Sequence, residues 1–189
     1  FSESRVRLSV FFIKENLIMI INAEIHTMDD KNTVIKNGYI RFSDGKISAV
    51  GEMSELRQTD TDVIDANGRQ VYPGFVDAHT HLGIFEDSLT FEGDDANEDT
   101  DPIMPQLRAI DAVNPFDKYF DEALSAGVTT VLTSPGSADP VAGQIAAIKT
   151  FGKRIDKMII KAPVAIKFAL GENPKSTYSD KDQTPVTRM

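Results

Sequence analysis

Residues 73–83 read Pro73-Gly74-Phe75-Val76-Asp77-Ala78-His79-Thr80-His81-Leu82-Gly83. The Pro-Gly pair breaks the preceding structure, and the apolar residues that follow it predict a short buried strand. Two histidines separated by one residue come at the end of this strand, and a Leu-Gly pair follows them. The segment therefore predicts a strand that presents two imidazoles at its carboxyl end.

Alternate residues of a strand face the same side, so Asp77, His79 and His81 are expected to point together. Two neutral imidazoles that converge in this way form half of a Zn²⁺, Fe²⁺ or Mn²⁺ site. The alternative is two polar residues on the exposed face of an edge strand. The apolar strand before the pair and the turn after it favour the metal site. The other histidine, His26, is expected to be structural or exposed.

The residues before this strand predict a small antiparallel β unit over 19–72. Asn37-Gly38 and Asp44-Gly45 are dipeptides typical of hairpin turns, because both positions of such turns need positive φ. Tyr39–Phe42 and Lys46–Val50 are expected to pair across the second turn, and Asp29–Asp30 is expected to turn the chain.

The residues after this strand predict alternating helices and strands. A helix is expected to begin at Asn114 and to end at Gly127, with Phe116 and Phe120 on its buried face. A buried strand follows at 128–132, and a second helix is expected from Asp139-Pro140 to about Gly152. A last strand within 159–170 is expected to be interrupted at Pro163. This order predicts a parallel α/β fold.

Composition restricts the partners and the chemistry. The 189 residues have a formal net charge of −9, which argues against nucleic acid and against an anionic membrane as partners. The absence of cysteine leaves only nitrogen and oxygen ligands for a metal and fits the cytoplasm, where we expect the protein. Residues 1–18 loosely resemble a signal peptide but have no cleavage site. We interpret residues 1–18 as an extension outside the regular pattern of the fold, which begins at Met19, a candidate start.

The segment 73–83 resembles the signature of the amidohydrolase superfamily of metal-dependent hydrolases. The β unit, including Val63-Ile64-Asp65-Ala66, resembles the sandwich domain that leads into the barrel of that family, and Gly127-Val128-Thr129-Thr130-Val131 resembles its second strand. The segment 167–175 is similar to the imidazolonepropionase-related branch. The resemblance extends from about residue 19 to the end of the chain, which we interpret as an N-terminal fragment.

The resemblance implies a (β/α)₈ TIM-type barrel over 73–189, incomplete in this chain and preceded by a β-sandwich part at 19–72. It also implies one or two divalent metal ions, zinc first and iron or manganese next, with His79 and His81 as ligands. Glu172 or Lys167, the latter in carbamylated form, is the candidate third ligand, and Glu172 is preferred. The alternatives are a loop carboxylate for Glu172 and a snorkelling cation for Lys167. The general-base Asp of the family is expected beyond Met189.

Two loops at the carboxyl ends of the strands are candidates for substrate contact. Thr133 and Ser134 follow the second barrel strand and are candidate substrate-binding residues, although their loop reads equally well as a turn. The acidic stretch at 86–101 is expected either to help select the substrate or to be a solvated loop.

The function that the resemblance implies is hydrolysis of a carbon–nitrogen bond in a small, cyclic amide-like substrate by metal-activated water. A deacetylase or dipeptidase on the same platform is an alternative, and so is a truncated chain without activity. The isolated chain is expected to be inactive. The expected partners are a small-molecule substrate, the C-terminal half of the barrel and, in a homo-oligomer, a second copy of the chain.

Overall fold

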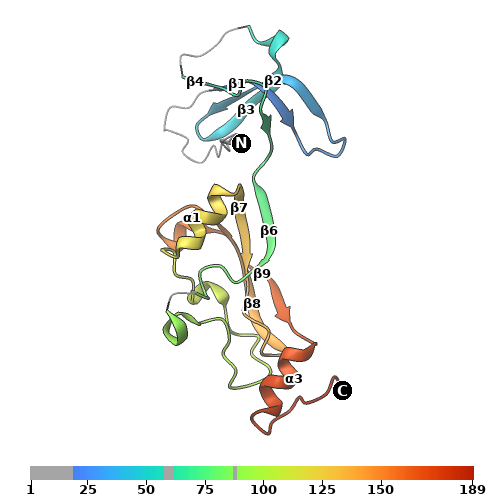
Figure 1. Ribbon diagram of the computed structural model, residues 1–189, viewed down its shortest axis with the longest axis vertical. Coiled ribbons are helices and arrows are strands. Elements are labelled where there is room, and N and C mark those ends of the chain that lie inside the picture. Colours follow the sequence, from blue (N-terminus) through green and yellow to red (C-terminus); the bar gives the residue numbers. More distant parts are fainter. Residues whose placement is uncertain (1–18, 58–61, 87–88) are drawn as a thin grey trace, which may run out of the picture. The chain divides into compact units, whose positions relative to one another are not determined.

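The computed structural model describes residues 19–57, 62–86 and 89–189 (Figure 1). The expected extension at 1–18 lies outside these residues. The chain divides into two compact units, Phe1–Gly74 and Phe75–Met189. The boundary expected from the sequence, after residue 72, lies two residues before this division.

The first unit is built on a five-stranded sheet with the order β3-β2-β1-β4, in which β5 also pairs with β1. Antiparallel pairing joins β1 to β2 and β2 to β3, whereas β4 and β5 run parallel to β1. Its core consists of Ile20, Ala23, Ile25, Ile40 and Ala66. The strands are β1 (Met19–His26), β2 (Val34–Ser43), β3 (Lys46–Glu52), β4 (Val63–Asp65) and β5 (Gln70–Val71).

One of the two expected hairpin turns is confirmed and the other is wrong. Asp44 and Gly45 both have positive φ, 51° and 69°, and join β2 to β3. Gly38 instead pairs with Ala23 inside β2, and a Cβ there would lie 2.6 Å from Cδ1 of Ile25. This glycine is therefore required for close packing and not for a turn.

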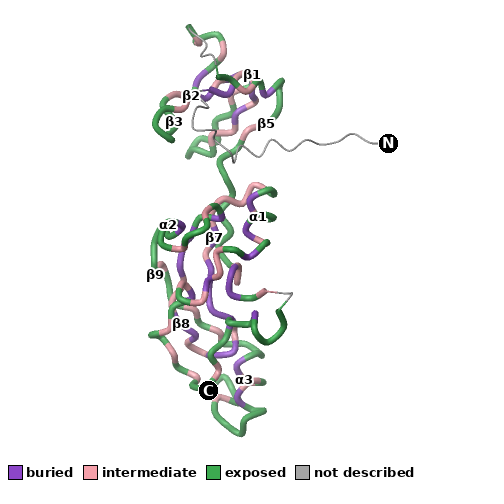
Figure 2. The backbone as a smooth tube through the Cα atoms, turned by 90° about the vertical axis from the view of Figure 1, so that its left-hand side faces the viewer, coloured by how far each residue is buried: buried purple, intermediate pink, exposed green. Residues whose placement is uncertain are grey.

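The second unit contains a four-stranded sheet with the order β6-β7-β8-β9. The strands are β6 (Phe75–Thr80), β7 (Val128–Thr133), β8 (Val141–Lys149) and β9 (Ile159–Phe168). β6 and β7 are parallel, as expected, and β8 is antiparallel to both β7 and β9. β9 therefore runs in the direction of β6 and β7. Figure 2 shows buried residues along β7 and β8.

The second expected helix, at 139–152, is wrong, because this segment forms β8. Its alanine-rich pattern fits one face of a helix as well as a buried strand, so packing decides between them. Gly143 has φ of +123°, which no helix contains, and a Cβ there would lie 2.7 Å from the carbonyl oxygen of Leu107. β7 and β9 supply backbone partners on both edges of the segment.

The first expected helix exists but is shorter, since α1 spans Lys118–Ser125. Its N-cap is Asp117, whose side chain accepts a hydrogen bond from Tyr119 N, and not Asn114. Phe116 therefore precedes the helix and is 67% exposed, which corrects its expected place on the buried face. The stop at Gly127 is confirmed by its φ of +92°. Figure 1 shows α1 beside β7.

The last strand is not interrupted at Pro163, because β9 runs through it. The register of its pairing with β8 shifts between Ile145 and Ala147, opposite the residues around Pro163. Since β9 has one partner strand among those described, a proline there removes no obligatory hydrogen bond. The helices α2 (Ile155–Met158) and α3 (Glu172–Ser179) flank this strand. In the described part of the chain, no helix is long and apolar enough to cross a membrane.

Candidate metal centre

The two histidines of the signature lie at the carboxyl end of β6. His79 is within the strand, and His81 follows its last residue, Thr80. Their ring centroids are 5.6 Å apart, with the ring planes at 79°. The sequence expectation that the two imidazoles come together is therefore met in the geometry.

The orientation of the His81 ring is set by the end of the next strand. Its Nδ1 lies 2.8 Å from the carbonyl oxygen of Ser134. Because a carbonyl oxygen can only accept, Nδ1 carries a hydrogen, and in the neutral ring the lone pair is then on Nε2. Histidines that bind metals are typically held by such a bond from the other ring nitrogen. The contact with Ser134 therefore prepares Nε2 of His81 to be a ligand.

The residues predicted to bind substrate, Thr133 and Ser134, are buried and bonded to the backbone around His81. The Thr133 hydroxyl donates to Leu82 O at 2.8 Å, and the Ser134 hydroxyl donates to Thr80 O at 3.2 Å. These bonds join the ends of β6 and β7. The structure thus gives both hydroxyls a positioning role, and their contact with a substrate stays a prediction.

The turn after the histidines is fixed by α1. The carboxylate of Asp117 accepts a hydrogen bond from Gly83 N at 3.2 Å, and Asn114 N donates to Gly83 O at 2.7 Å. Gly83 has φ of +84°, and a Cβ there would lie 2.9 Å from Cγ1 of Val113. From the sequence, Asp117 is expected only as a weak capping-box residue of a helix that begins at Asn114, so its roles as N-cap and as acceptor for Gly83 N are not predicted.

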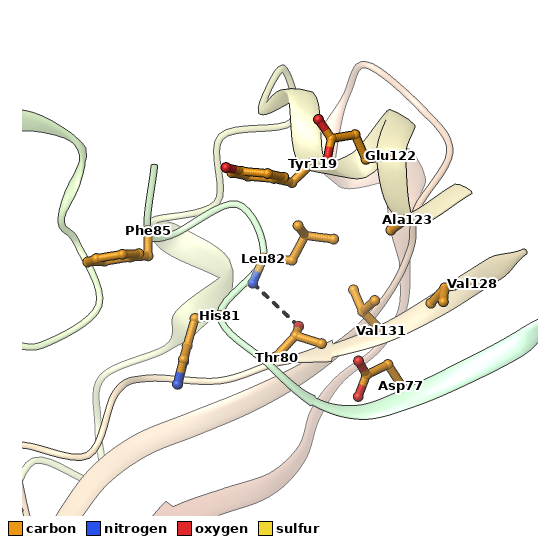
Figure 3. A pocket seen from close by; sticks show the side chains of 10 residues that line it. All are labelled: Asp77, Thr80, His81, Leu82, Phe85, Tyr119, Glu122, Ala123, Val128 and Val131. Atoms are coloured by element: carbon orange, nitrogen blue, oxygen red, sulfur yellow. Dashed lines mark hydrogen bonds between the residues drawn. The ribbon is translucent and has the colours of Figure 1, made fainter. Parts of the chain in front are cut away.

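Asp77 does not join the imidazoles as a further oxygen donor. Its Oδ1 accepts a hydrogen bond from the backbone N of His79 at 3.1 Å. It also lines a cavity of about 400 Å³ between α1 and the strands (Figure 3). In Figure 3 the His81 ring extends away from Tyr119 and Glu122 of this cavity. His81 therefore lies at the edge of this cavity, of which it is a lining residue, while its ring is directed away from the α1 side.

Lys167 is the candidate third ligand that the structure brings to the histidines. Its Nζ lies 3.2 Å from Nε2 of His79, and its half-buried position lowers the pKa of the amine through desolvation. β6 and β9 are separated by two strands, about 14 Å on a flat sheet at the usual strand spacing. The contact therefore requires the sheet to curve toward this face, the two side chains to lean across it, or both.

Glu172, the preferred candidate, is placed differently from its expected position. β9 ends at Phe168, and Glu172 is the first residue of α3. Its side chain is 85% exposed and lies 3.8 Å from Lys175 Nζ. The expectation that Glu172 stands at a strand end is therefore wrong. Of the two candidates, only Lys167 contacts an imidazole through a hydrogen bond in the described structure.

No family model matches the chain. A solved amidohydrolase structure from Thermotoga maritima MSB8 matches 91% of it at 40% identity, with a TM-score of 0.83. The amidohydrolase tasK of Hapsidospora irregularis is 32% identical over 169 residues, 84% of this chain. The chain belongs to the amidohydrolase superfamily. An imidazolonepropionase of Symbiobacterium thermophilum is 49% identical over 70 residues, which cover 34% of this amidohydrolase chain.

This amidohydrolase chain spans only part of each relative. It corresponds to 17% of the tasK protein, 15% of the imidazolonepropionase and 44% of the Thermotoga chain.

The superfamily generally uses divalent metals, and the described residues fit part of such a site. The bond from Nδ1 of His81 leaves Nε2 of that ring for a ligand role, and Lys167 Nζ lies beside Nε2 of His79. Within residues 19–57, 62–86 and 89–189, no three His, Asp or Glu side chains are grouped to hold an ion. The donor set in this amidohydrolase chain is therefore a partial one.

His26 has a structural place in the first unit. Its ring stacks on Tyr72 with centroids 4.2 Å apart, and Nε2 lies 3.0 Å from Glu24 Oε1. These contacts agree with the expectation that His26 is a structural residue.

Proposed function

We propose that the protein is a metal-dependent hydrolase that cleaves a carbon–nitrogen bond other than a linear peptide bond. The observation that carries this proposal is the pair His79 and His81, with His81 oriented by the Ser134 carbonyl. The names of the relatives, an amidohydrolase and an imidazolonepropionase, support hydrolysis of such bonds.

In this proposal, His79 and His81 hold a divalent ion, zinc first, through Nε2. When bound, such an ion polarises the scissile group and activates water. In the neutral ring, the Ser134 carbonyl holds the hydrogen on Nδ1 of His81, which leaves the lone pair on Nε2. Lys167 has to be neutral, or carbamylated, beside a cation, and desolvation already lowers the pKa of its amine.

We further propose that β6 and β7 are the first strands of a (β/α)₈ barrel and that the first unit is part of a β-sandwich. The parallel pairing of β6 with β7 through the α1 crossover and the contact between His79 and Lys167 support this fold. The likeness to the Thermotoga structure supports it too. β8 would then be an addition between two barrel strands.

The partner proposed for the open sheet is the C-terminal half of such a barrel. Large apolar side chains are exposed on both outer strands, and a sheet rarely leaves such faces and edges uncovered. That half would also supply the general-base Asp and further ligands. The exposed residues are Phe75 and Val76 on β6 and Ile159, Ile160, Ile166 and Phe168 on β9.

The proposed substrate is a small cyclic amide. The support is the likeness to the imidazolonepropionase, which is confined to 70 residues. Fold alone does not select a substrate, so deacetylase and dipeptidase activities belong in the same assay.

The test is metal content and hydrolysis by protein made from its full reading frame, with His79→Ala, His81→Ala and the matched control His26→Ala. We expect about one or two ions per chain, loss of metal and activity in the first two variants, and neither loss in the third. Wild-type protein that binds no metal with both histidines intact would overturn the proposal.

A further inference from the structure

The segment that joins β7 to β8 is buried although it is a loop. Among the residues at 133–139, only Ser137 is outside the buried class. Loops usually run over the surface, because their backbone groups need hydrogen-bond partners. The partners that this loop does find therefore show what holds it in place.

One side of the loop is held by Asn97, from the acidic stretch after β6. Ala138 N donates to Oδ1 of Asn97 at 3.0 Å, and Gly136 N donates to the neighbouring Ala96 O at 2.7 Å. A Cβ on Gly136 would lie 2.2 Å from Oδ1 of Asn97, so the amide is seated directly on the glycine. The acidic stretch is thus part of a packed contact at this point.

The other side of the loop is held by Tyr178 of α3. Its hydroxyl donates to Oδ1 of Asp139 at 2.6 Å, with Tyr178 0% and Asp139 1% exposed. Burial raises the pKa of the Asp139 carboxyl, and burial with the Asp139 contact raises the pKa of Tyr178. Lys181, just after α3, pairs with Asp99 Oδ1 at 2.9 Å. The helix is therefore tied to both loops.

The Ser134 carbonyl depends on this anchoring. Ser134 N donates to Thr80 O at 3.0 Å, which fixes the peptide group between Thr133 and Ser134. The carbonyl belongs to the next peptide plane, whose nitrogen is that of Pro135 and has no hydrogen. The first backbone donor after it is Gly136 N, which is held by Ala96. The direction of the carbonyl is thus set from the Asn97 and Tyr178 side.

We propose that Asn97 and Tyr178 are positioning residues of the metal centre, which clamp the 133–139 loop and so hold the Ser134 carbonyl at Nδ1 of His81. The inference rests on the proposed function, because orienting His81 matters only if that residue binds a metal. The contacts of the loop do not depend on the proposed function. Asn97 and Tyr178 act through the loop, so their loss should change His81 and spare His79.

The test uses Asn97→Ala and Tyr178→Phe in protein made from its full reading frame and labelled with ¹⁵N-histidine. Imidazole ¹⁵N resonances, assigned with His79→Ala and His81→Ala, report which ring nitrogen carries the hydrogen. In metal-free protein of both variants, we expect the His81 resonances to show a mixture of Nδ1–H and Nε2–H forms in place of the Nδ1–H form alone. The His79 resonances should stay as in the wild type. The Kd for Zn²⁺, from chelator competition, should rise about 10-fold, the lower end for such supporting contacts.

Two further variants separate positioning from general stability. Asn97→Asp keeps an acceptor for Ala138 N and should restore the wild-type resonances and Kd. Tyr72→Phe removes a hydroxyl that bonds only to Gln70 among the described contacts, and it should change neither.

Unchanged His81 resonances in folded Asn97→Ala would overturn the clamp, and so would equal shifts of both imidazoles. Asn97 is largely exposed, so this variant keeps the test available if Tyr178→Phe fails to fold. If the wild-type protein binds no Zn²⁺, the proposed function fails, while the metal-free spectra still decide the clamp.

Discussion

Lys167 Nζ and His79 Nε2 lie 3.2 Å apart, although 88 positions separate the two residues in the sequence. The contact joins the first and last strands of the four-stranded sheet. It places an amine at the ring nitrogen that a metal ion would use. Of the two candidate third ligands, this geometry favours Lys167 over Glu172.

The first prediction separates those two candidates. Lys167→Ala should weaken Zn²⁺ binding about 10-fold to 100-fold, because it removes the group beside Nε2 of His79. Glu172→Gln should leave the Kd within about twofold, because that carboxylate is exposed and pairs only weakly with Lys175. Chelator competition measures both constants. The reverse order of effects would restore Glu172 as the ligand.

The part of the site that was predicted from sequence is the part that local pattern controls. The apolar run after Pro73-Gly74 and the spacing of His79 and His81 are enough to predict a strand with two converging imidazoles. The Asp44-Gly45 turn was predictable for the same reason, because positive φ at both positions is a local requirement.

The rest depends on packing between distant segments. The alanine-rich residues of β8 fit a helix locally, and only the strands on either side of them make the sheet the better partner. Glu172 was expected at a strand end, whereas β9 ends at Phe168 and Glu172 begins α3. The approach of Lys167 to His79 depends on how the sheet curves and how the two side chains lean, which no local pattern encodes.

The second prediction concerns the turn after the histidines. Gly83→Ala should lower the free energy of unfolding by about 2 kcal/mol or more, because φ is +84° and the new Cβ would meet Val113 and Phe120. Gly45→Ala is the matched control, since its φ of +69° gives similar backbone strain but nothing lies within 4 Å of its Cβ position. Urea titration measures both. Equal losses would contradict the local explanation.

The third prediction concerns Asp117, which caps α1 and also accepts from Gly83 N. Asp117→Ala should destabilise the protein by about 2 kcal/mol, because it removes an N-cap and leaves a buried N–H without its acceptor. Asp121→Ala, at an exposed position of the same helix, should cost about 0.5 kcal/mol or less. Thermal unfolding of the two variants side by side makes the comparison. A similar loss of stability in both variants would contradict the stabilising role of the two hydrogen bonds that Asp117 accepts.

The last prediction is a dependence of stability on pH that comes from Asp139. Burial, the largest influence, raises the pKa of its carboxyl above the ordinary 3.8, as do Asp99 and Glu98, whereas Tyr178 and Lys181 act in the opposite direction. The folded chain therefore keeps the proton at pH values where the unfolded chain has lost it. The stability that this proton supplies is complete below the ordinary pKa and is lost as the pH rises through the raised pKa.

Asp139→Asn removes this titration and keeps an oxygen that can accept from the Tyr178 hydroxyl. The free energy of unfolding of the variant minus that of the wild type should therefore become more positive from about pH 4 upward and then level off. The Tyr178 hydroxyl does not disturb this window, because its pKa is raised further above its ordinary 10.0. Urea titrations at successive pH values supply the two curves. Parallel curves would show that the Asp139 carboxyl has the same proton affinity in the folded and unfolded chains, and so that its burial is relieved in solution.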